Sequence, residues 1–216
     1  MKIALIGATG FVGSNLLHEA LNRGHQVTAI VRDPAKLAQQ HENLTVVTGD
    51  ATKVDELAAQ LAGHDVVLNA FNAGWTNPNL YQDFLQGCQD IEAATEKSGV
   101  PRLVVIGGAG SLYINGQQLV DGPQFPAEYK PGATAARDYL NRLRHNTTLD
   151  WTFFSPAIEM HRGIDKGRTG HYRVGTESPV FDENGRSVLS GEDLAVAVLD
   201  ELEQPRFSRQ RFTAAY

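Results

Sequence analysis

Cysteine is nearly absent from this chain: among 216 residues, Cys88 is the only one. A single cysteine excludes an intramolecular disulfide and any zinc or iron–sulfur site built on several cysteines. Such sparse usage is typical of the reducing cytosol, where a lone thiol is usually a small buried hydrophobe. We therefore expect a cytoplasmic protein.

Long apolar runs and an excess of positive charge are also missing. No run approaches the ~20 apolar residues of a membrane span, so no membrane partner is expected. The chain begins with a strand-like run and not with a charged segment and a cleavage site, so no targeting sequence is expected. The 19 Lys and Arg against 25 Asp and Glu give a net charge of −6. Nucleic-acid-binding domains usually have a basic footprint, so no nucleic-acid partner is expected.

Metal ligands do not cluster along the sequence. The seven histidines include no pair with ligand spacing on one helix, and no cysteine cluster accompanies them. We expect no metal site. No apolar stripe stands clear of what the core needs, so an oligomer is possible but the sequence does not define it.

What the chain does have is an alternation of short apolar runs with segments of helical periodicity. The runs that predict strands are 2–6, 26–31, 44–48, 66–70, 103–106, 151–154 and 211–214. Helical spacing covers 11–23, 54–61, 79–98, 133–144 and a last helix that begins at Ser190. This order predicts an α/β fold with a single doubly wound parallel sheet, the Rossmann fold, and helices on both faces.

The length sets the domain organisation that we expect. At about 100–200 residues per domain, residues 1–216 are expected to form one domain with a small C-terminal lid. We place a lid-like substrate region around 112–132 and 157–189, with one hairpin inside the loop-rich stretch 163–185.

Glycine, at 21 residues, is the unusual component, and three glycines form the motif GATGFVG at residues 7–13. The motif directly follows the first predicted strand and runs into the first predicted helix, as in dinucleotide-binding proteins. Gly7 permits the tight turn, Gly10 lets a pyrophosphate approach the backbone, and Gly13 lets helix and strand pack closely. The alternative is a glycine-rich turn needed only for packing. The residues of this loop expected to contact the cofactor are Gly7, Thr9, Gly10, Phe11, Val12 and Gly13.

The end of the second predicted strand distinguishes NADP from NAD. NAD enzymes place a carboxylate about 20 residues after the motif to bind the ribose 2′-hydroxyl. Here Arg32 lies 19 residues after Gly13, and arginine pairs well with a 2′-phosphate. NADPH is therefore favoured over NADH, although the neighbouring Asp33 leaves NAD open. Asp50 and Ala51 end the third strand, where they contact the adenine or, alternatively, only begin a helix.

Several segments resemble a known family. They are GATGFVGS at 7–14, GGAGSL at 107–112, FPAEYKP at 125–131, LDWTFFSPA at 149–157 and RQRFTAAY at 209–216. Together they resemble the atypical short-chain dehydrogenase/reductase group, and more narrowly the NADH–flavin reductases related to NmrA-like proteins and biliverdin reductase B. The likeness extends over essentially the whole chain. It implies a reductase that moves hydride from a nicotinamide to a flavin, a quinone or a similar acceptor.

The acid–base pair of ordinary short-chain dehydrogenases is half absent. That pair is Tyr-x-x-x-Lys on one helix, whereas here Tyr129 is followed four residues later by Ala133. Pro131 is expected to keep residues 128–130 out of a helix. A tyrosine without an assisting lysine titrates near pH ~10 and is a poor proton donor at neutral pH. Alcohol–ketone interconversion and epimerase chemistry are thus disfavoured, and hydride transfer to an acceptor that takes its proton from water remains.

Candidate site residues follow the carboxyl ends of the later strands, where ligands bind in open α/β sheets. Those expected to contact the cofactor are Ala70, Phe71, Asn72, Gly108, Ser155, Pro156 and Ala157. Phe71 alternatively packs in the core. Ser111 is a candidate catalytic residue that touches the substrate or the carboxamide, unless it is a turn serine bonded to its own backbone. His161 and Tyr129 are the other catalytic candidates, with His161 contacting the acceptor or donating a proton.

The loops expected to cover the site carry aromatic and basic side chains. Trp75 and Tyr113 follow the fourth and fifth strands, so either can stack on a planar acceptor. In the region 157–189, four basic residues are Arg162, Lys166, Arg168 and Arg173. They form a solvated loop or, alternatively, bind a phosphate-bearing acceptor such as FMN.

Two other functions remain open at this point. A non-catalytic NADP-sensing module, as among NmrA-like proteins, is compatible with the missing lysine. Reduction of a small carbonyl or enone metabolite is a third possibility. The sequence does not identify the acceptor, because loop conformation decides it.

Overall fold

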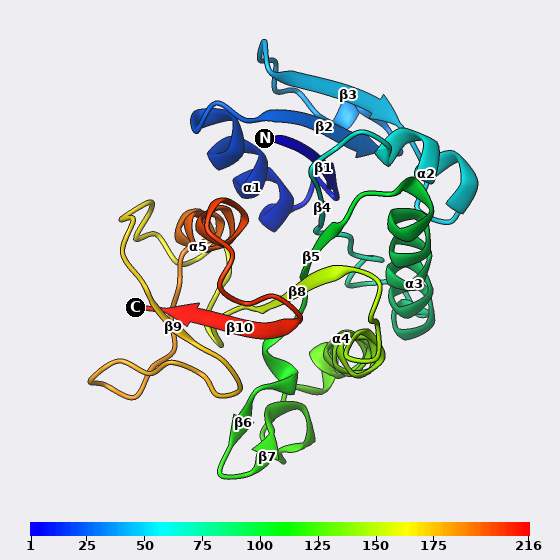
Figure 1. The fold of residues 1–216 in the computed structure, drawn as a ribbon. Helices are drawn as coiled ribbons and strands as arrows, with labels where there is room; N and C mark the ends of the chain where they lie inside the picture. The colour runs from blue at the N-terminus through cyan, green and yellow to red at the C-terminus, as the bar shows by residue number, and fades with distance from the viewer.

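The structure is a computed structural model that describes all residues, 1–216, around one eight-stranded sheet (Figure 1). Its seven parallel strands are β1 (Lys2–Ile6), β2 (Gln26–Val31), β3 (Leu44–Thr48), β4 (Val66–Asn69), β5 (Arg102–Ile106), β8 (Asp150–Ser155) and β10 (Gln210–Ala215). Its five helices are α1 (Phe11–Asn22), α2 (Val54–Leu61), α3 (Leu80–Ser98), α4 (Lys130–Leu143) and α5 (Gly191–Glu203). Every predicted strand and helix is present to within a few residues, which confirms the predicted fold class.

The strand order is β3-β2-β1-β4-β5-β8-β10-β9, and all pairs are parallel except the last. From β1 the chain first adds strands on one side, to β3, and then returns to add β4 on the other side. The order therefore reverses between β1 and β4. In doubly wound sheets this reversal opens a crevice at the carboxyl ends of the strands, and ligands bind there.

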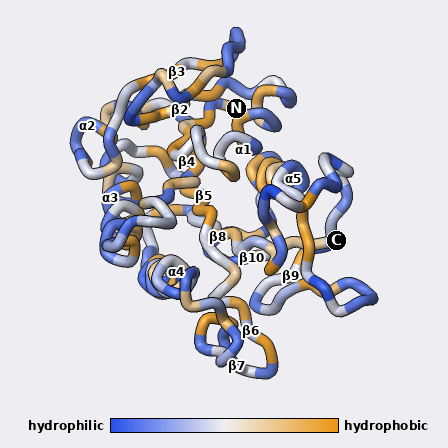
Figure 2. Tube along the Cα trace, turned by 180° about the vertical axis from the view of Figure 1, so that it is seen from behind, coloured by the Kyte–Doolittle hydropathy of each residue, from blue (hydrophilic) through white to orange (hydrophobic).

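Two apolar layers hold the helices against the sheet. Side chains of α1 and α5 share one buried cluster with the strands, and those of α2, α3 and α4 share a second cluster on the opposite face. Figure 2 shows the central strands as the most hydrophobic parts of the trace. Strands buried on both faces are expected to be continuous apolar runs without alternation, and β1, β4 and β5 are of this kind.

The loop regions differ from expectation in one respect. The hairpin expected within 163–185 is not there; instead β9 (Arg173–Gly175) pairs antiparallel with β10 and closes that edge of the sheet. A small hairpin lies elsewhere, formed by β6 (Tyr113–Ile114) and β7 (Gln117–Gln118). The positive φ values of Asn115 and Gly116 allow its two-residue turn. The sequence signal of this hairpin was therefore in the turn and not in the strands.

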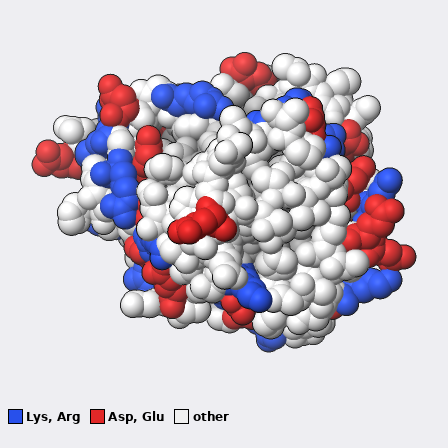
Figure 3. Space-filling view, turned by 90° about the horizontal axis from the view of Figure 1, so that it is seen from above, with Lys and Arg blue, Asp and Glu red and all other residues white.

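The surface and the helices give two further observations. On the face drawn in Figure 3, basic and acidic side chains are interspersed along the margin, and much of the centre is uncharged. No helix in the structure combines the length and the apolarity needed to cross a bilayer.

Candidate functional site

The loop between β1 and α1 has three glycines with different physical roles. Gly7 has a φ of +88°, and a Cβ added to it would stand 2.3 Å from the carbonyl oxygen of Ala70. A Cβ on Gly13 would stand 1.8 Å from the carbonyl oxygen of Gly7. Around Gly10 the nearest atom is 3.5 Å away, so the protein itself does not require glycine at this position. The free space at Gly10 suits a ligand that approaches the backbone.

The N-terminus of α1 is open to an anion. No side chain caps the helix, and no acidic residue lies in its first turn. The first N–H groups of a helix have no intrahelical partner and carry the positive end of the helix dipole. Thr9 and Gly10 are exposed, and Phe11 and Val12 are half-buried. These residues fit the pyrophosphate of a dinucleotide, which the N–H groups of the first turn would hold.

At the end of β2, Arg32 and Asp33 are in different situations. One carboxylate oxygen of Asp33 accepts a hydrogen bond of 3.1 Å from the backbone N–H of Ala35 and so caps the short 3-10 helix η1 (Pro34–Lys36). Arg32 is exposed and has no hydrogen bond or ion pair to a side chain of the protein. The cation is thus available to a ligand, whereas the carboxylate is partly engaged.

Asp50 lies within the electrostatic reach of Arg32 after β3. Its Oδ1 accepts hydrogen bonds from the backbone N–H and the hydroxyl of Thr52, at 2.9 and 2.8 Å. These bonds, with smaller contributions from nearby cations that include Arg32, hold the pKa of Asp50 below its usual value. Asp50 therefore forms the turn before α2. The contact of Asp50 and Ala51 with an adenine stays a prediction.

The segment after β4 is fixed by contacts within the protein. The Phe71 ring lies 6.2 Å from the Phe84 ring, and Gly87 of α3 makes room for it, since a Cβ there would come within 2.3 Å. The side-chain oxygen of Asn72 accepts a 2.7 Å bond from the N–H of Gly74. The ring of Phe71 is thus packed on α3, as in the core alternative, and Ala70 contributes its carbonyl to the floor beneath Gly7.

Two candidate serines from distant segments meet at one buried arginine. Ser111 lies in the 3-10 turn η2 (Ala109–Ser111) after β5, and Ser155 ends β8; they are 2% and 0% exposed. Arg211 of β10 donates from Nη1 to both hydroxyls, at 2.9 and 3.1 Å, and from Nη2 to the Ser111 carbonyl at 3.2 Å. Ser111 is therefore not bonded to its own backbone. Its direct contact with a substrate stays a prediction, and its buried position points to a role in shaping the site.

Arg211 also connects this cluster to the loop 157–189. Its Nη2 donates a 2.6 Å bond to Glu177, which Arg144 of α4 contacts as well. Burial alone would raise the pKa of Glu177, but the hydrogen bond and charge of Arg211 outweigh it, so the pKa lies below its ordinary value. The sequence did not suggest Arg211 as a site residue. The available signal was an arginine within the apolar strand segment of RQRFTAAY.

Tyr129 stands at the start of α4, and the expectation for this segment is corrected. Residues 128–130 are not outside helical structure: Ala127–Tyr129 form the 3-10 turn η4, and α4 begins at Lys130 with Pro131 in its first turn. Proline is tolerated there because the first N–H groups of a helix have no acceptor in the helix. Ala133 packs on the turn η2, where a Cβ added to Gly110 would lie 2.9 Å from its methyl. The Tyr-x-x-x-Lys pair therefore lacks its lysine, although the helix that would carry that lysine is present.

His161 and Arg162 are neighbours in the loop 157–189, near the N-terminus of α1. His161 is exposed, and its Nδ1 accepts a 3.1 Å bond from the N–H of Gly163. The guanidinium of Arg162 stacks on the ring of Phe11, 4.8 Å from its centroid, beside the N-terminus of α1. His161 is thus held near the glycine loop through its neighbour, and its action on an acceptor stays a prediction. Pro156 and Ala157, which precede this loop, are buried.

The other basic residues of this loop are engaged inside the protein. Lys166 lies 3.9 Å from the ring centroid of Tyr216, and Arg168 bonds Glu19 at 2.9 Å through both Nε and Nη2. Arg173 donates to the backbone carbonyls of Phe181 and Tyr216, at 2.8 and 2.6 Å. The alternative of a phosphate-binding loop is therefore weakened, because Arg168 and Arg173 are hydrogen-bonded within the protein and only Arg162 and Lys166 form no hydrogen bond or ion pair.

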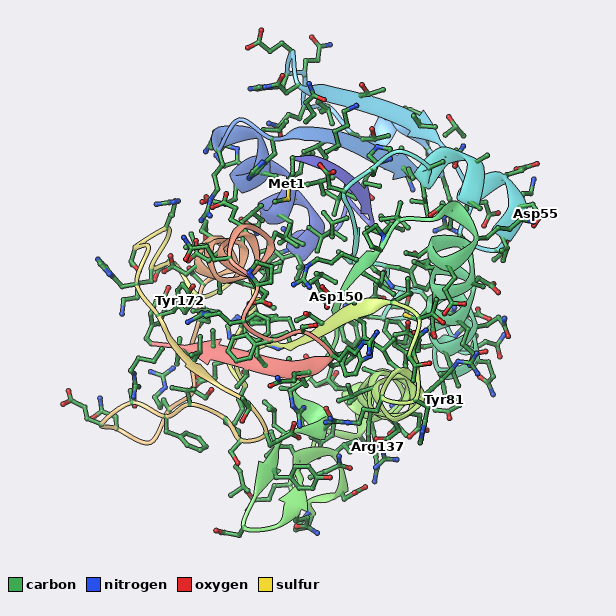
Figure 4. All side chains as sticks on the ribbon, viewed as in Figure 1. Met1, Asp55, Tyr81, Arg137, Asp150 and Tyr172 are labelled. Atoms are coloured by element: carbon green, nitrogen blue, oxygen red, sulfur yellow. The ribbon has the colours of Figure 1, made fainter.

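A buried carboxylate fastens the same loop to α5. Asp193 is 0% exposed and accepts bonds from the N–H groups of Thr169 and Gly170, at 2.9 and 2.8 Å, and from the hydroxyl of Tyr216 at 2.6 Å. Tyr172 adds a 2.6 Å bond to Asp200, and Figure 4 shows it beside α5. These bonds fasten residues 169–172 of the loop to α5.

On the other face of the sheet, α3 and α4 are joined by a side-chain hydrogen bond. The Tyr81 hydroxyl donates a 2.7 Å bond to Asp138, next to Arg137 on α4. Figure 4 labels Tyr81 and Arg137 near the contact of α3 and α4. Deeper in this layer, burial raises the pKa of the Cys88 thiol to about 12. Cys88 is therefore protonated and unreactive, as expected for a small core residue.

Comparison with known proteins agrees with this geometry. Residues 7–205 match the family described as NAD(P)H-binding. The uncharacterized protein YwnB of Bacillus subtilis (strain 168) is 37% identical over 217 residues, which cover 99% of this chain and 97% of YwnB. A "putative epimerase" of Bacteroides thetaiotaomicron has a similar structure, with a TM-score of 0.91 and 43% identity over 100% of this chain and 96% of that one.

A second solved structure is that of a "putative NADH-flavin reductase" of Streptococcus pneumoniae TIGR4. It has a TM-score of 0.86 and 34% identity and covers 100% of this chain and 99% of that one. The resemblance predicted from the sequence motifs is confirmed at the level of the family. The protein belongs to the NAD(P)H-binding family, with an oxidoreductase-like Rossmann fold of the atypical short-chain dehydrogenase type.

Proposed function

We propose that this protein is an NADPH-dependent reductase that passes hydride to a planar acceptor, a flavin or a quinone. The observation that carries the proposal is Ala133. It occupies the position of the missing lysine, beside Tyr129 and against the turn η2, and its methyl brings no charge to the site. The chain thus keeps a nicotinamide-binding fold and lacks the group that would make a tyrosine an effective acid. A flavin or quinone suits such a site because its reduced form takes its proton from water.

The residues divide the work of binding. A bound nicotinamide dinucleotide supplies the hydride. The open backbone at Gly10 and the first turn of α1 hold its pyrophosphate, and Arg162 above Phe11 adds a cation beside that turn. Arg32 supports the preference for NADPH over NADH, since its charge is uncommitted whereas Asp33 caps η1.

The wider organisation is part of the proposal. Residues 1–216 act as a single domain in which 112–132 and 157–189 enclose a small-molecule acceptor; neither nucleic acid nor membrane takes part. A lone, fully buried thiol supports a cytoplasmic location. Fractionation of cells that express the tagged chain checks the location.

The test is turnover with a panel of acceptors. Loss of NADPH absorbance is followed with FMN, riboflavin and a naphthoquinone, each against its uncatalysed rate. The proposal expects catalysed oxidation with at least one of them. Rates that stay at the uncatalysed level with all three exclude the reductase.

A second candidate is a non-catalytic module that senses the NADP redox state. It is favoured by Ala133, because no lysine four residues after Tyr129 assists that tyrosine as a proton donor. Tight NADPH binding with no turnover, together with capture of a protein partner that depends on NADP, would support it. Reduction of a small carbonyl compound is less favoured, because Tyr129 has no lysine to assist it; the same holds for epimerase chemistry.

A further inference from the structure

Two aromatic rings lie exposed together next to the proposed site. Trp75 is 61% exposed and Tyr129 is 47% exposed, the highest values among the large hydrophobic side chains of the protein. Their ring centroids are 5.8 Å apart, and the ring planes meet at 86°. In an edge-to-face pair the edge of one ring covers one face of the other, so at least one face of each ring is left uncovered by its partner. Two exposed aromatic rings that lie together are suited to contact with a planar ligand.

The position of the pair relates it to the strand ends. Trp75 is carried by the loop after β4, and Tyr129 directly precedes α4. Trp75 rests on the first turn of α4, where a Cβ added to Gly132 would lie 3.2 Å from its Cζ3. The next residue, Ala133, contacts Gly110 of η2. Trp75 therefore contacts the residue next to the one that packs on η2. This places the rings near the carboxyl edge of the sheet, where the nicotinamide end of a dinucleotide is expected.

The loop that carries Trp75 is well ordered by its own hydrogen bonds. Asn72 accepts from the N–H of Gly74 at 2.7 Å, and Asn77 accepts from the N–H of Asn79 at 2.9 Å. The Asn77 amide also donates to the Ala73 carbonyl and to Asp83, at 3.1 and 2.8 Å. Trp75 is thus held in place before a ligand arrives, which reduces the entropy lost on binding.

We propose that Trp75 and Tyr129 form the stacking platform for the planar acceptor, the isoalloxazine of a flavin or the ring system of a naphthoquinone. This inference rests on the proposed function and specifies where its second substrate binds. Tyr129 acts here through its ring, and its hydroxyl is not required. The acceptor lies on the exposed Trp75 face with the Tyr129 ring as a side wall, within reach of η2 and the nicotinamide.

The first experiment measures the contact without turnover. The chain has two tryptophans. Because Trp151 is buried at 2% exposure, Trp75 is the tryptophan that riboflavin can reach from the solvent. Riboflavin is titrated into the protein saturated with NADP⁺, and its dissociation constant is measured by calorimetry and by quenching of its own emission. Because stacking on an aromatic side chain contributes roughly one factor of ten or more, Trp75→Ala is expected to weaken riboflavin about ten-fold. NADP⁺ affinity is expected to stay the same.

Variants of Tyr129 separate the ring from the hydroxyl. Tyr129→Phe is expected to bind riboflavin as the wild type does, and Tyr129→Ala to bind it several-fold less tightly. Val46→Ala, which removes an exposed apolar side chain from edge strand β3, serves as the matched control and is expected to change neither constant. Unchanged riboflavin affinity in both Trp75→Ala and Tyr129→Ala overturns the platform.

Steady-state kinetics distinguish this inference from the proposed function. A ten-fold rise in the KM for the acceptor in Trp75→Ala, with the KM for NADPH unchanged, supports both. Turnover with an unchanged acceptor KM overturns the platform and keeps the reductase. Saturable riboflavin binding that depends on Trp75, with no wild-type turnover of FMN, riboflavin or the naphthoquinone, keeps the platform and removes the reductase.

Discussion

Within the loop after β1, Gly10 and Gly13 lack a side chain for different reasons. Gly13 packs against the Gly7 carbonyl, whereas Gly10 faces open space. Gly13→Ala is therefore expected to destabilise the fold, because a Cβ at 1.8 Å from an oxygen forces the backbone apart. Gly10→Ala is expected to keep the free energy of unfolding within about 1 kcal/mol and to weaken NADPH binding by ten-fold or more.

Thermal unfolding and calorimetric titration of NADPH measure the two effects on the same samples. If Gly10→Ala binds NADPH as tightly as the wild type, the pyrophosphate does not approach this position.

Arg32 is a second residue whose role is testable alone. Its charge has no partner in the protein, so Arg32→Ala removes a charge-assisted bond to the 2′-phosphate and is expected to cost about 1.5–3 kcal/mol of NADPH binding. NADH, which lacks that phosphate, is expected to bind almost unchanged. Arg32→Lys, which keeps the charge but not the planar fork, should fall between the two. Equal losses for both cofactors would show that the preference for NADP has another origin.

Between elements, Arg211 joins η2, β8 and the loop 157–189 to the last strand. Arg211→Met keeps most of the volume but leaves the two serines without their buried donor, so it is expected to lower the free energy of unfolding by about 2–3 kcal/mol. Glu177→Gln is the milder partner change, since Glu177 is 46% exposed and water can replace its bonds. Urea unfolding of both variants measures the difference. A Met variant as stable as the wild type would mean that the serines find other partners.

The elements themselves were largely predictable, and their contacts were not. Short apolar runs and helical spacing located β1 to β5 and α1 to α3, because burial on one or two faces leaves a local pattern. Pro131 misled the prediction at α4, since a first-turn proline leaves the same residue signal as a helix breaker. The contacts of Ser111 with Arg211, and of Glu19 with Arg168, join residues 100 and 149 positions apart. No local pattern contains them, so the sequence could propose residues for the site walls but not the contacts that support those residues.

At the scale of the whole molecule, stability in acid should follow the carboxylates that are paired with arginine. The hydrogen bond from Arg168 leads the effects that hold the pKa of Glu19 below its usual value, and the pKa of Glu177 is also low. A carboxylate with a depressed folded pKa stabilises the protein fully above its unfolded pKa, about 4.5, and this stabilisation is lost as the pH falls through the folded pKa. The Tm is therefore expected to be flat from pH ~7 to ~5 and to fall below pH ~4.5.

Glu19→Gln removes one of these titrating groups. We expect it to be about 1–3 kcal/mol less stable near neutral pH, because the carboxylate loses its ion pairs with Arg23 and Arg168. We also expect it to lose less Tm on acidification than the wild type. Glu42→Gln, an exposed position without an ion pair, is the control and should keep the wild-type profile. Scanning calorimetry at a series of pH values measures both. Parallel acid branches for the wild type and Glu19→Gln would contradict this assignment.

The hydrogen bonds from Thr169 and Gly170 to Asp193 have a consequence for the rate at which the protein binds its cofactor. Residues 168–170, here called the strap, are fastened to α5 through Asp193 and to α1 through the bond of Arg168 to Glu19, so cofactor binding does not have to order this segment. Most of the conformational entropy of the strap is lost during folding, before any encounter. Association should then proceed in one kinetic phase whose observed rate rises linearly with cofactor concentration, without the plateau that a slow closing step imposes.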